Sequence, residues 1–166
     1  MAKKNKEISS SNLIKVKPIT EGQKSVFETW KQGKNQFLFG CAGTGKTFVS
    51  LYLAMQDVLD LKTKYDKVIL VRSLIPTREI GFLPGDEEDK AALYQVPYQN
   101  MVKFMFEQPN EQAFNMLYDR LKNQGSLYFL STSFLRGLTF DNSIIIVDEL
   151  SLIHISEPTR PNNIAY

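Results

Sequence analysis

The stretch of sequence that decides the fold lies at residues 40–47 and reads Gly40-Cys41-Ala42-Gly43-Thr44-Gly45-Lys46-Thr47. It fits the pattern of a glycine, four further residues, a second glycine, a lysine and a hydroxyl-bearing residue. An apolar run at residues 36–39 precedes it, and residues 46–61 follow it with apolar side chains at helical spacing. The sequence therefore predicts a strand, a glycine-rich loop and a helix in succession.

A loop with this pattern is a Walker A signature, which binds the phosphates of a nucleotide. Its glycines allow successive backbone N–H groups to converge on one anion, and the positive end of the following helix faces the same point. On this hypothesis Lys46 contacts the β and γ phosphates, and the hydroxyl of Thr47 coordinates the accompanying Mg²⁺. We expect all eight residues to line the site. A chance match is the alternative, but the flanking strand and helix disfavour it.

A second strand-like run, residues 142–147, ends in four consecutive β-branched residues and is followed directly by Asp148 and Glu149. Such a run is typical of a strand buried on both faces of a parallel sheet. The acidic pair resembles a Walker B motif, in which Asp148 holds Mg²⁺ through water and Glu149 polarises the attacking water as general base. Lys46 and Glu149 are accordingly the candidate catalytic residues, with Thr47 and Asp148 as candidate metal ligands. In isolation, the two acids would be a solvated cap on a strand.

Length and composition narrow the class of protein further. The 166 residues suit one domain, and 20 basic against 18 acidic side chains give a net charge of +2 that identifies no partner. The single cysteine, Cys41, excludes an internal disulfide framework; its thiol is either an inert filler of the loop or a reactive group near a helix N-terminus. No apolar run approaches the length of a membrane span and no signal peptide is visible, so we expect a cytoplasmic protein without a membrane partner.

Periodicity predicts the remaining elements. We expect helices at residues 20–31, 46–61, 98–106 and 111–121, the last two within an otherwise irregular insertion. We expect strands at residues 36–39, 67–71, 126–130 and 142–147. Alternating strands and helices argue for an α/β domain, a three-layer sandwich around a mainly parallel sheet. Residues 1–12 are polar and lysine-bearing, which predicts a flexible arm ahead of a domain at 13–150.

With both motifs in place, the chain resembles the PhoH-like branch of P-loop ATPases, a group similar to the core of superfamily 1 helicases. Besides the two motifs, the resemblance rests on Leu70 to Arg72, Gly81 to Asp86 and Phe134 to Thr139. It implies a RecA-like P-loop NTPase core, ATP and Mg²⁺ as cofactors, and ATP hydrolysis in the full-length parent. It leaves open coupling to RNA or other single-stranded nucleic acid, assembly into a homo-oligomer, and the alternative of a nucleotide-binding switch that hydrolyses little.

The resemblance also singles out three side chains outside the motifs. Gln23 is similar to the glutamine with which helicase-like ATPases recognise adenine, because its amide both donates and accepts hydrogen bonds; a helix-capping role is the alternative. Arg72 and Arg136 take positions where the family places cations near phosphate or nucleic acid, although arginines are also common on protein surfaces.

The C-terminal end departs from the family pattern, because Leu150, Ser151 and Leu152 stand where the family usually has Ala, Gln and Asn. Residues 151–161 resemble a translated sequencing adaptor. We therefore expect native sequence to stop near Glu149 or Leu150, and residues 151–166 to be a non-native tail. The class places a further strand between those of the two motifs, so we expect a core that is incomplete at the C-terminus and binds nucleotide weakly.

Overall fold

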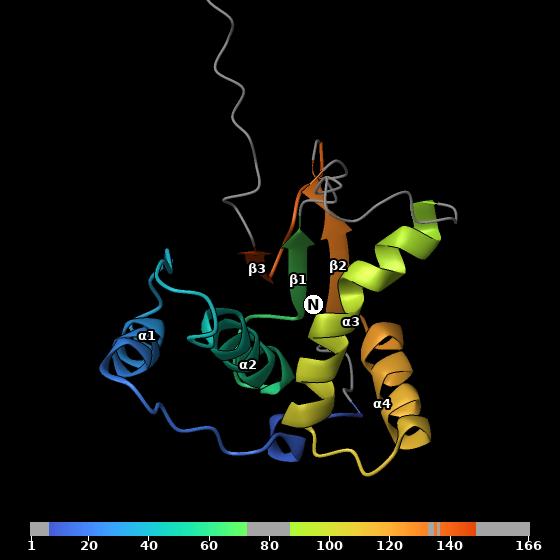
Figure 1. Cartoon of the computed structure of the whole chain (residues 1–166), viewed down its shortest axis with the longest axis horizontal. Coiled ribbons are helices and arrows are strands. Elements are labelled where there is room, and N and C mark those ends of the chain that lie inside the picture. The colour runs from blue at the N-terminus through green and yellow to red at the C-terminus, as the bar shows by residue number, and fades with distance from the viewer. Residues whose placement is uncertain (1–6, 73–86, 133–134, 136, 149–166) are drawn as a thin grey trace, which may run out of the picture.

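The computed structural model describes residues 7–72, 87–132, 135 and 137–148 (Figure 1). In chain order the elements are η1 Ser10–Asn12, α1 Glu21–Lys31, α2 Lys46–Leu59, β1 Lys67–Arg72, α3 Glu87–Met105, α4 Glu111–Asn123, β2 Leu127–Ser131 and β3 Ser143–Asp148.

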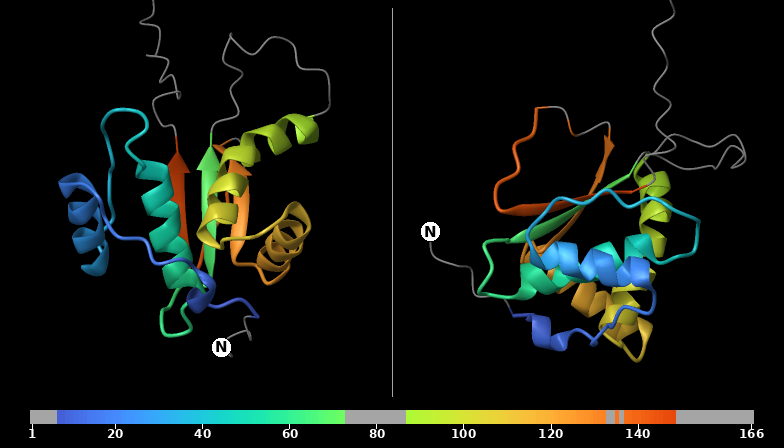
Figure 2. Two further views of the ribbon diagram at one scale, coloured as in Figure 1. Left: turned by 60° about the horizontal axis from the view of Figure 1, so that its bottom comes forward. Right: turned by 90° about the vertical axis from the view of Figure 1, so that its left-hand side faces the viewer.

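The three strands form one parallel sheet in the order β2-β1-β3. In register, Leu70 of β1 lies between Phe129 of β2 and Ile146 of β3. The four apolar residues 68–71 of β1 are all buried, as is typical of a central strand with a neighbour on each side. Because the strands run in the same direction, their carboxyl ends meet at one edge of the sheet (Figure 2).

Helices α2, α3 and α4 lie on one face of this sheet, and α1 packs beside α2 (Figure 2). The core between helices and sheet is apolar: Met55 of α2, Met105 of α3 and Leu121 of α4 are fully buried in the same cluster as Leu70. On the opposite face, Val147 of the edge strand β3 is 41% exposed. None of the helices described here is long and apolar enough for a membrane crossing. The predicted α/β class with a parallel sheet is confirmed.

Most of the predicted elements are confirmed as well. Strands β1, β2 and β3 begin and end within one residue of their predicted positions, because apolar runs indicate strands locally. The predicted burial of β3 on both faces is wrong: it is an edge strand, and Ile145 and Val147 are 46% and 41% exposed. Helix α1 begins directly after Thr20. The insertion is more regular than its prolines suggest, since α3 runs for 19 residues and includes Pro97. A helix tolerates such a residue when packing compensates for the lost backbone hydrogen bond, and Tyr98 and Val102 of α3 are buried.

One predicted strand is wrong. Residues 36–39 do not form a strand in the structure, and the rings of Phe37 and Phe39 are 75% and 85% exposed. The amide of Gln36 instead donates a hydrogen bond to the carbonyl oxygen of Val26 in α1, at 3.0 Å. An apolar run becomes a strand only when a partner takes up its N–H and C=O groups, and none of the three described strands pairs with this segment.

The start of the described chain also differs from its prediction as a flexible arm. Residues 10–12 form the short helix η1, and the flanking side chains of Ile8 and Leu13 are 6% and 8% exposed. Both belong to the main apolar cluster, and the N–H of Ile14 donates to the carbonyl oxygen of Met105 at 2.9 Å. Two buried residues are too few to produce a visible period, so their packing was not evident in the sequence.

Candidate nucleotide-binding site

The glycine-rich loop leads directly into the amino end of α2. Gly43 and Gly45 have φ angles of 76° and 79°, in the left-handed region that glycine adopts without a steric penalty. Gly45 is the N-cap of α2, and no side chain caps the helix there. The first N–H groups of α2 are thus available to an anion, as the pattern of residues 40–47 predicts.

Lys46 is folded back over this loop. Its ammonium group donates to the carbonyl oxygens of Gly40 at 3.1 Å and Cys41 at 2.7 Å, and lies 3.4 Å from the hydroxyl oxygen of Thr44. Cys41 is exposed and takes part through its backbone, since its carbonyl oxygen also accepts a hydrogen bond from the Thr44 hydroxyl. The positive charge of Lys46 therefore lies at the mouth of the loop, where a phosphate oxygen would compete with these carbonyls.

The two predicted motifs meet in space. The hydroxyl oxygen of Thr47, in the first turn of α2, lies 3.1 Å and 3.2 Å from the two carboxylate oxygens of Asp148, the last residue of β3. These residues are 101 positions apart in the sequence. The structure thus brings both candidate metal ligands together at the carboxyl edge of the sheet, beside the loop.

The chemistry of this pair suits Mg²⁺. Hydroxyl and carboxylate oxygens are hard ligands, and Mg²⁺ is usually held by one or two carboxylates together with substrate phosphates and water. Among the described residues, no three His, Cys, Asp or Glu side chains gather into a group that could hold a metal by themselves. The oxygen atoms of Thr47 and Asp148 fit a Mg²⁺ ion whose other ligands are phosphate and water.

Sequence reasoning missed a third residue at this site. The hydroxyl of Tyr98, in α3, donates a hydrogen bond of 2.7 Å to Oδ2 of Asp148. Its side chain is 3% exposed, and at the level of sequence it is one of several aromatic and apolar residues at helical spacing, typical of a core position. No local signal separates a tyrosine that reaches a carboxylate from one that only packs.

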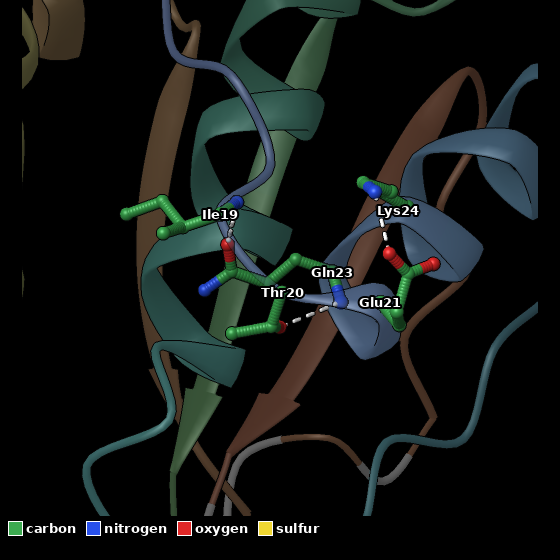
Figure 3. Close-up of polar contacts among 5 residues, drawn as sticks. All are labelled: Ile19, Thr20, Glu21, Gln23 and Lys24. Atoms are coloured by element: carbon green, nitrogen blue, oxygen red, sulfur yellow. Dashed lines mark hydrogen bonds and ion pairs between the residues drawn. The ribbon is translucent and has the colours of Figure 1, made fainter.

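Gln23 belongs to the first turn of α1, and Figure 3 shows its contacts with Thr20 and Ile19. Its backbone N–H donates to the Thr20 hydroxyl at 3.2 Å, and its side-chain Oε1 accepts from the N–H of Ile19 at 2.8 Å. The other end of the amide, Nε2, donates to the carbonyl oxygen of Thr44 at 3.2 Å. Gln23 thus takes part in the cap of α1 through its backbone, while its side chain lies against the loop.

Arg72 stands at the carboxyl end of β1, level with Asp148 of β3 and Ser131 of β2. Its guanidinium lies 5.4 Å from the ring centre of Tyr94 and 6.0 Å from that of Tyr98. The predicted cation is therefore at the same edge of the sheet as the carboxylate, stacked on aromatic rings of α3.

The remaining predicted site features, namely Glu149, Arg136, residues 81–86 and the tail from residue 151, lie outside the described residues.

The parallel sheet, with its helices and a glycine-rich loop running into the amino end of α2, defines the class: the fold is that of a RecA-like P-loop NTPase core. A model of the family described as PhoH-like protein matches residues 15–155. The chain therefore belongs to the PhoH-like protein family.

Individual relatives agree with this family. The chain is 30% identical to Protein PhoH2 of Bacillus subtilis over 113 residues, covering 68% of this chain and 25% of that protein. It is 30% identical to a PhoH-like protein of the same organism over 137 residues, covering 82% and 40%. It is 32% identical to Protein PhoH of Escherichia coli over 115 residues, covering 68% and 30%. The chain thus spans between 25% and 40% of the length of these relatives.

Proposed function

We propose that this chain binds ATP together with Mg²⁺ at the loop of residues 40–47, and that the longer protein to which such a domain belongs hydrolyses the ATP. The observation that carries the proposal is the contact between Thr47 and Asp148 at 3.1 Å, because it joins the end of the loop to a carboxylate on a separate strand. A glycine-rich turn that matched the pattern by chance would have no reason to meet an acid there.

Each residue has a defined part in this proposal. The backbone N–H groups of the loop and of the first turn of α2 hold the triphosphate, and Lys46 exchanges its carbonyl partners for phosphate oxygens. Thr47 and Asp148 hold the Mg²⁺, which when bound neutralises charge on the phosphates. Gln23, whose amide touches the loop at Thr44, is placed to contact the nucleotide, with adenine as the proposed partner.

For hydrolysis, Glu149 is the proposed general base because it directly follows Asp148 in the sequence. The energy released is proposed to drive remodelling of RNA or another single-stranded nucleic acid. A nucleotide-binding switch with little turnover is the alternative function, and the hydrolysis experiment below distinguishes the two.

Binding is tested by replacing the lysine of the loop. Lys46→Ala should weaken the affinity for a fluorescent ATP analogue by about tenfold or more, since a charge-assisted contact to phosphate is lost. Lys62→Ala is the matched control: this exposed lysine follows the far end of the same helix, ~20 Å away by the rise of α2. Equal affinities of the wild type and the Lys46→Ala variant would contradict the proposed site.

Hydrolysis is tested on the longer protein with Glu149→Gln. This variant should bind ATP as tightly as the wild type while phosphate release falls by about 100-fold or more, within the range for loss of a general base. Stimulation of wild-type turnover by single-stranded RNA, with a strong dependence on salt, supports the nucleic-acid role. Tight ATP binding with negligible turnover in the wild type would contradict hydrolysis and favour the switch.

A further inference from the structure

Two hydroxyl groups that come from different helices contact the carboxylate of Asp148. Thr47 approaches it from α2, and Tyr98 approaches it from α3. The contact from Tyr98 is the shorter of the two, at 2.7 Å against 3.1 Å and 3.2 Å. Short O–H···O bonds to an ionised carboxylate are among the stronger hydrogen bonds in proteins.

The two hydroxyls differ in how they orient the carboxylate of Asp148. Thr47 is almost equally distant from Oδ1 and Oδ2, so its contact does not fix the rotation of the carboxylate about its last bond. Tyr98 donates to Oδ2, which holds that oxygen toward α3, while Oδ1 lies 3.1 Å from the hydroxyl oxygen of Thr47. Of these two hydroxyls, that of Tyr98 is therefore the one that orients the carboxylate of Asp148.

The phenol of Tyr98 is itself held by its surroundings. The side chain is 3% exposed, its ring packs against Phe129 with centroids 5.8 Å apart, and the Arg72 guanidinium lies over it at 6.0 Å. A buried ring with contacts on a strand and on a cation has little freedom to swing its hydroxyl away. The donor to Asp148 is thus fixed before any ligand arrives.

We propose that Tyr98 is a positioning residue for the metal side of the nucleotide site: its hydroxyl orients Asp148 so that one carboxylate oxygen faces the Mg²⁺ position beside Thr47. The inference rests on the proposed binding of Mg²⁺ with ATP and goes beyond it, because Tyr98 belongs to neither sequence motif. Loss of such an outer hydrogen bond to a ligand typically weakens metal binding by about 10- to 100-fold. The Mg²⁺ affinity of the site then depends on the packing of α3.

The test compares nucleotide affinity with Mg²⁺ and with EDTA in the full chain carrying Tyr98→Phe. Phenylalanine keeps the buried ring and removes only the hydroxyl. We expect the ratio of the two dissociation constants, EDTA over Mg²⁺, to fall by about tenfold, with the EDTA value itself nearly unchanged. A purely structural defect lowers the folded fraction in both buffers equally and leaves this ratio constant.

Tyr94→Phe is the matched control, because Tyr94 is also a residue of α3 and its ring also lies beside Arg72. It should retain the wild-type ratio. An unchanged ratio in Tyr98→Phe, or an equal fall in both variants, overturns the role of Tyr98 and leaves the nucleotide site standing. A wild-type chain that binds ATP equally with and without Mg²⁺, or not at all, overturns the metal site and this inference together.

Discussion

At the scale of single residues, one hydrogen bond joins the helix that carries Gln23 to the helix that carries Lys46 and Thr47. The indole N–H of Trp30 in α1 donates to Oδ2 of Asp57 in α2, at 2.9 Å. Burial raises the pKa of Asp57 above its ordinary value of 3.8; the Trp30 hydrogen bond opposes this shift, and the charge of Asp60 adds to it. The link between the helices thus uses a carboxylate that is costly to ionise.

This raised pKa gives stability a pH dependence. The folded state holds the Asp57 proton more tightly than the unfolded chain, so the stability it contributes is fully present below 3.8 and lost as pH rises through the folded pKa. Asp57→Asn keeps an acceptor for Trp30 without a charge. The melting temperature of this variant relative to wild type should therefore be higher at pH about 7 than at pH about 4. A difference in melting temperature that stays constant with pH would contradict this account.

At the scale of elements, helix α2 begins differently from helices α1 and α4. Thr20 caps α1 by accepting from the N–H of Gln23, and Asn110 caps α4 by accepting from the N–H of Ala113 at 2.8 Å. Helix α2 begins at Gly45 without a side-chain cap. A capping side chain would occupy the place of an anion, so its absence at α2 is the local condition for phosphate binding.

Removal of either cap should therefore lower stability, but only removal of the cap on α1 should also weaken ATP binding. Thr20→Ala and Asn110→Ala should each lower the free energy of unfolding in urea by about 1 kcal/mol. Only Thr20→Ala should also weaken the binding of the fluorescent ATP analogue, because the cap of α1 holds Gln23 beside the loop. Identical ATP affinities in the two variants would show that the position of Gln23 does not matter for binding.

At the scale of the whole molecule, the site exists because one layer of helices packs on one face of a parallel sheet. Tyr98 and Thr47 come from neighbouring helices of that layer, and Asp148 comes from the sheet beneath them. The packing that sets these distances is apolar, and it extends to Ile8 near the start of the described chain. Core packing and site geometry are therefore coupled.

Two methionines test how far stability depends on this core. Met105, at the end of α3, is 0% exposed, whereas Met116 on α4 is 60% exposed. Met105→Ala should lower the free energy of unfolding by about 2–5 kcal/mol, a large share of the stability of an ordinary domain. Met116→Ala should change it by less than about 0.5 kcal/mol. Similar urea midpoints for the two variants would mean that the helical layer is not tightly packed.

The loop, the helix after it and the three strands were all predictable, because each depends on short-range information. Glycine spacing permits the left-handed turns at Gly43 and Gly45, and the apolar run that ends at Val147 specifies a strand, although not its burial. The wrongly predicted strand at 36–39 marks the limit of this reasoning, since a ladder requires a partner that no local pattern supplies.

The sequence by itself determined which residues could bind a phosphate and which acids could stand at the end of a strand. Only the tertiary structure decided that Asp148 meets Thr47, 101 positions away, and Tyr98, 50 positions away. Local propensities act within a few residues, whereas these contacts follow from how α2 and α3 pack across the sheet. For that reason the sequence pattern around Tyr98 is that of an ordinary core residue. Only the structure shows that its hydroxyl donates to the carboxylate of Asp148.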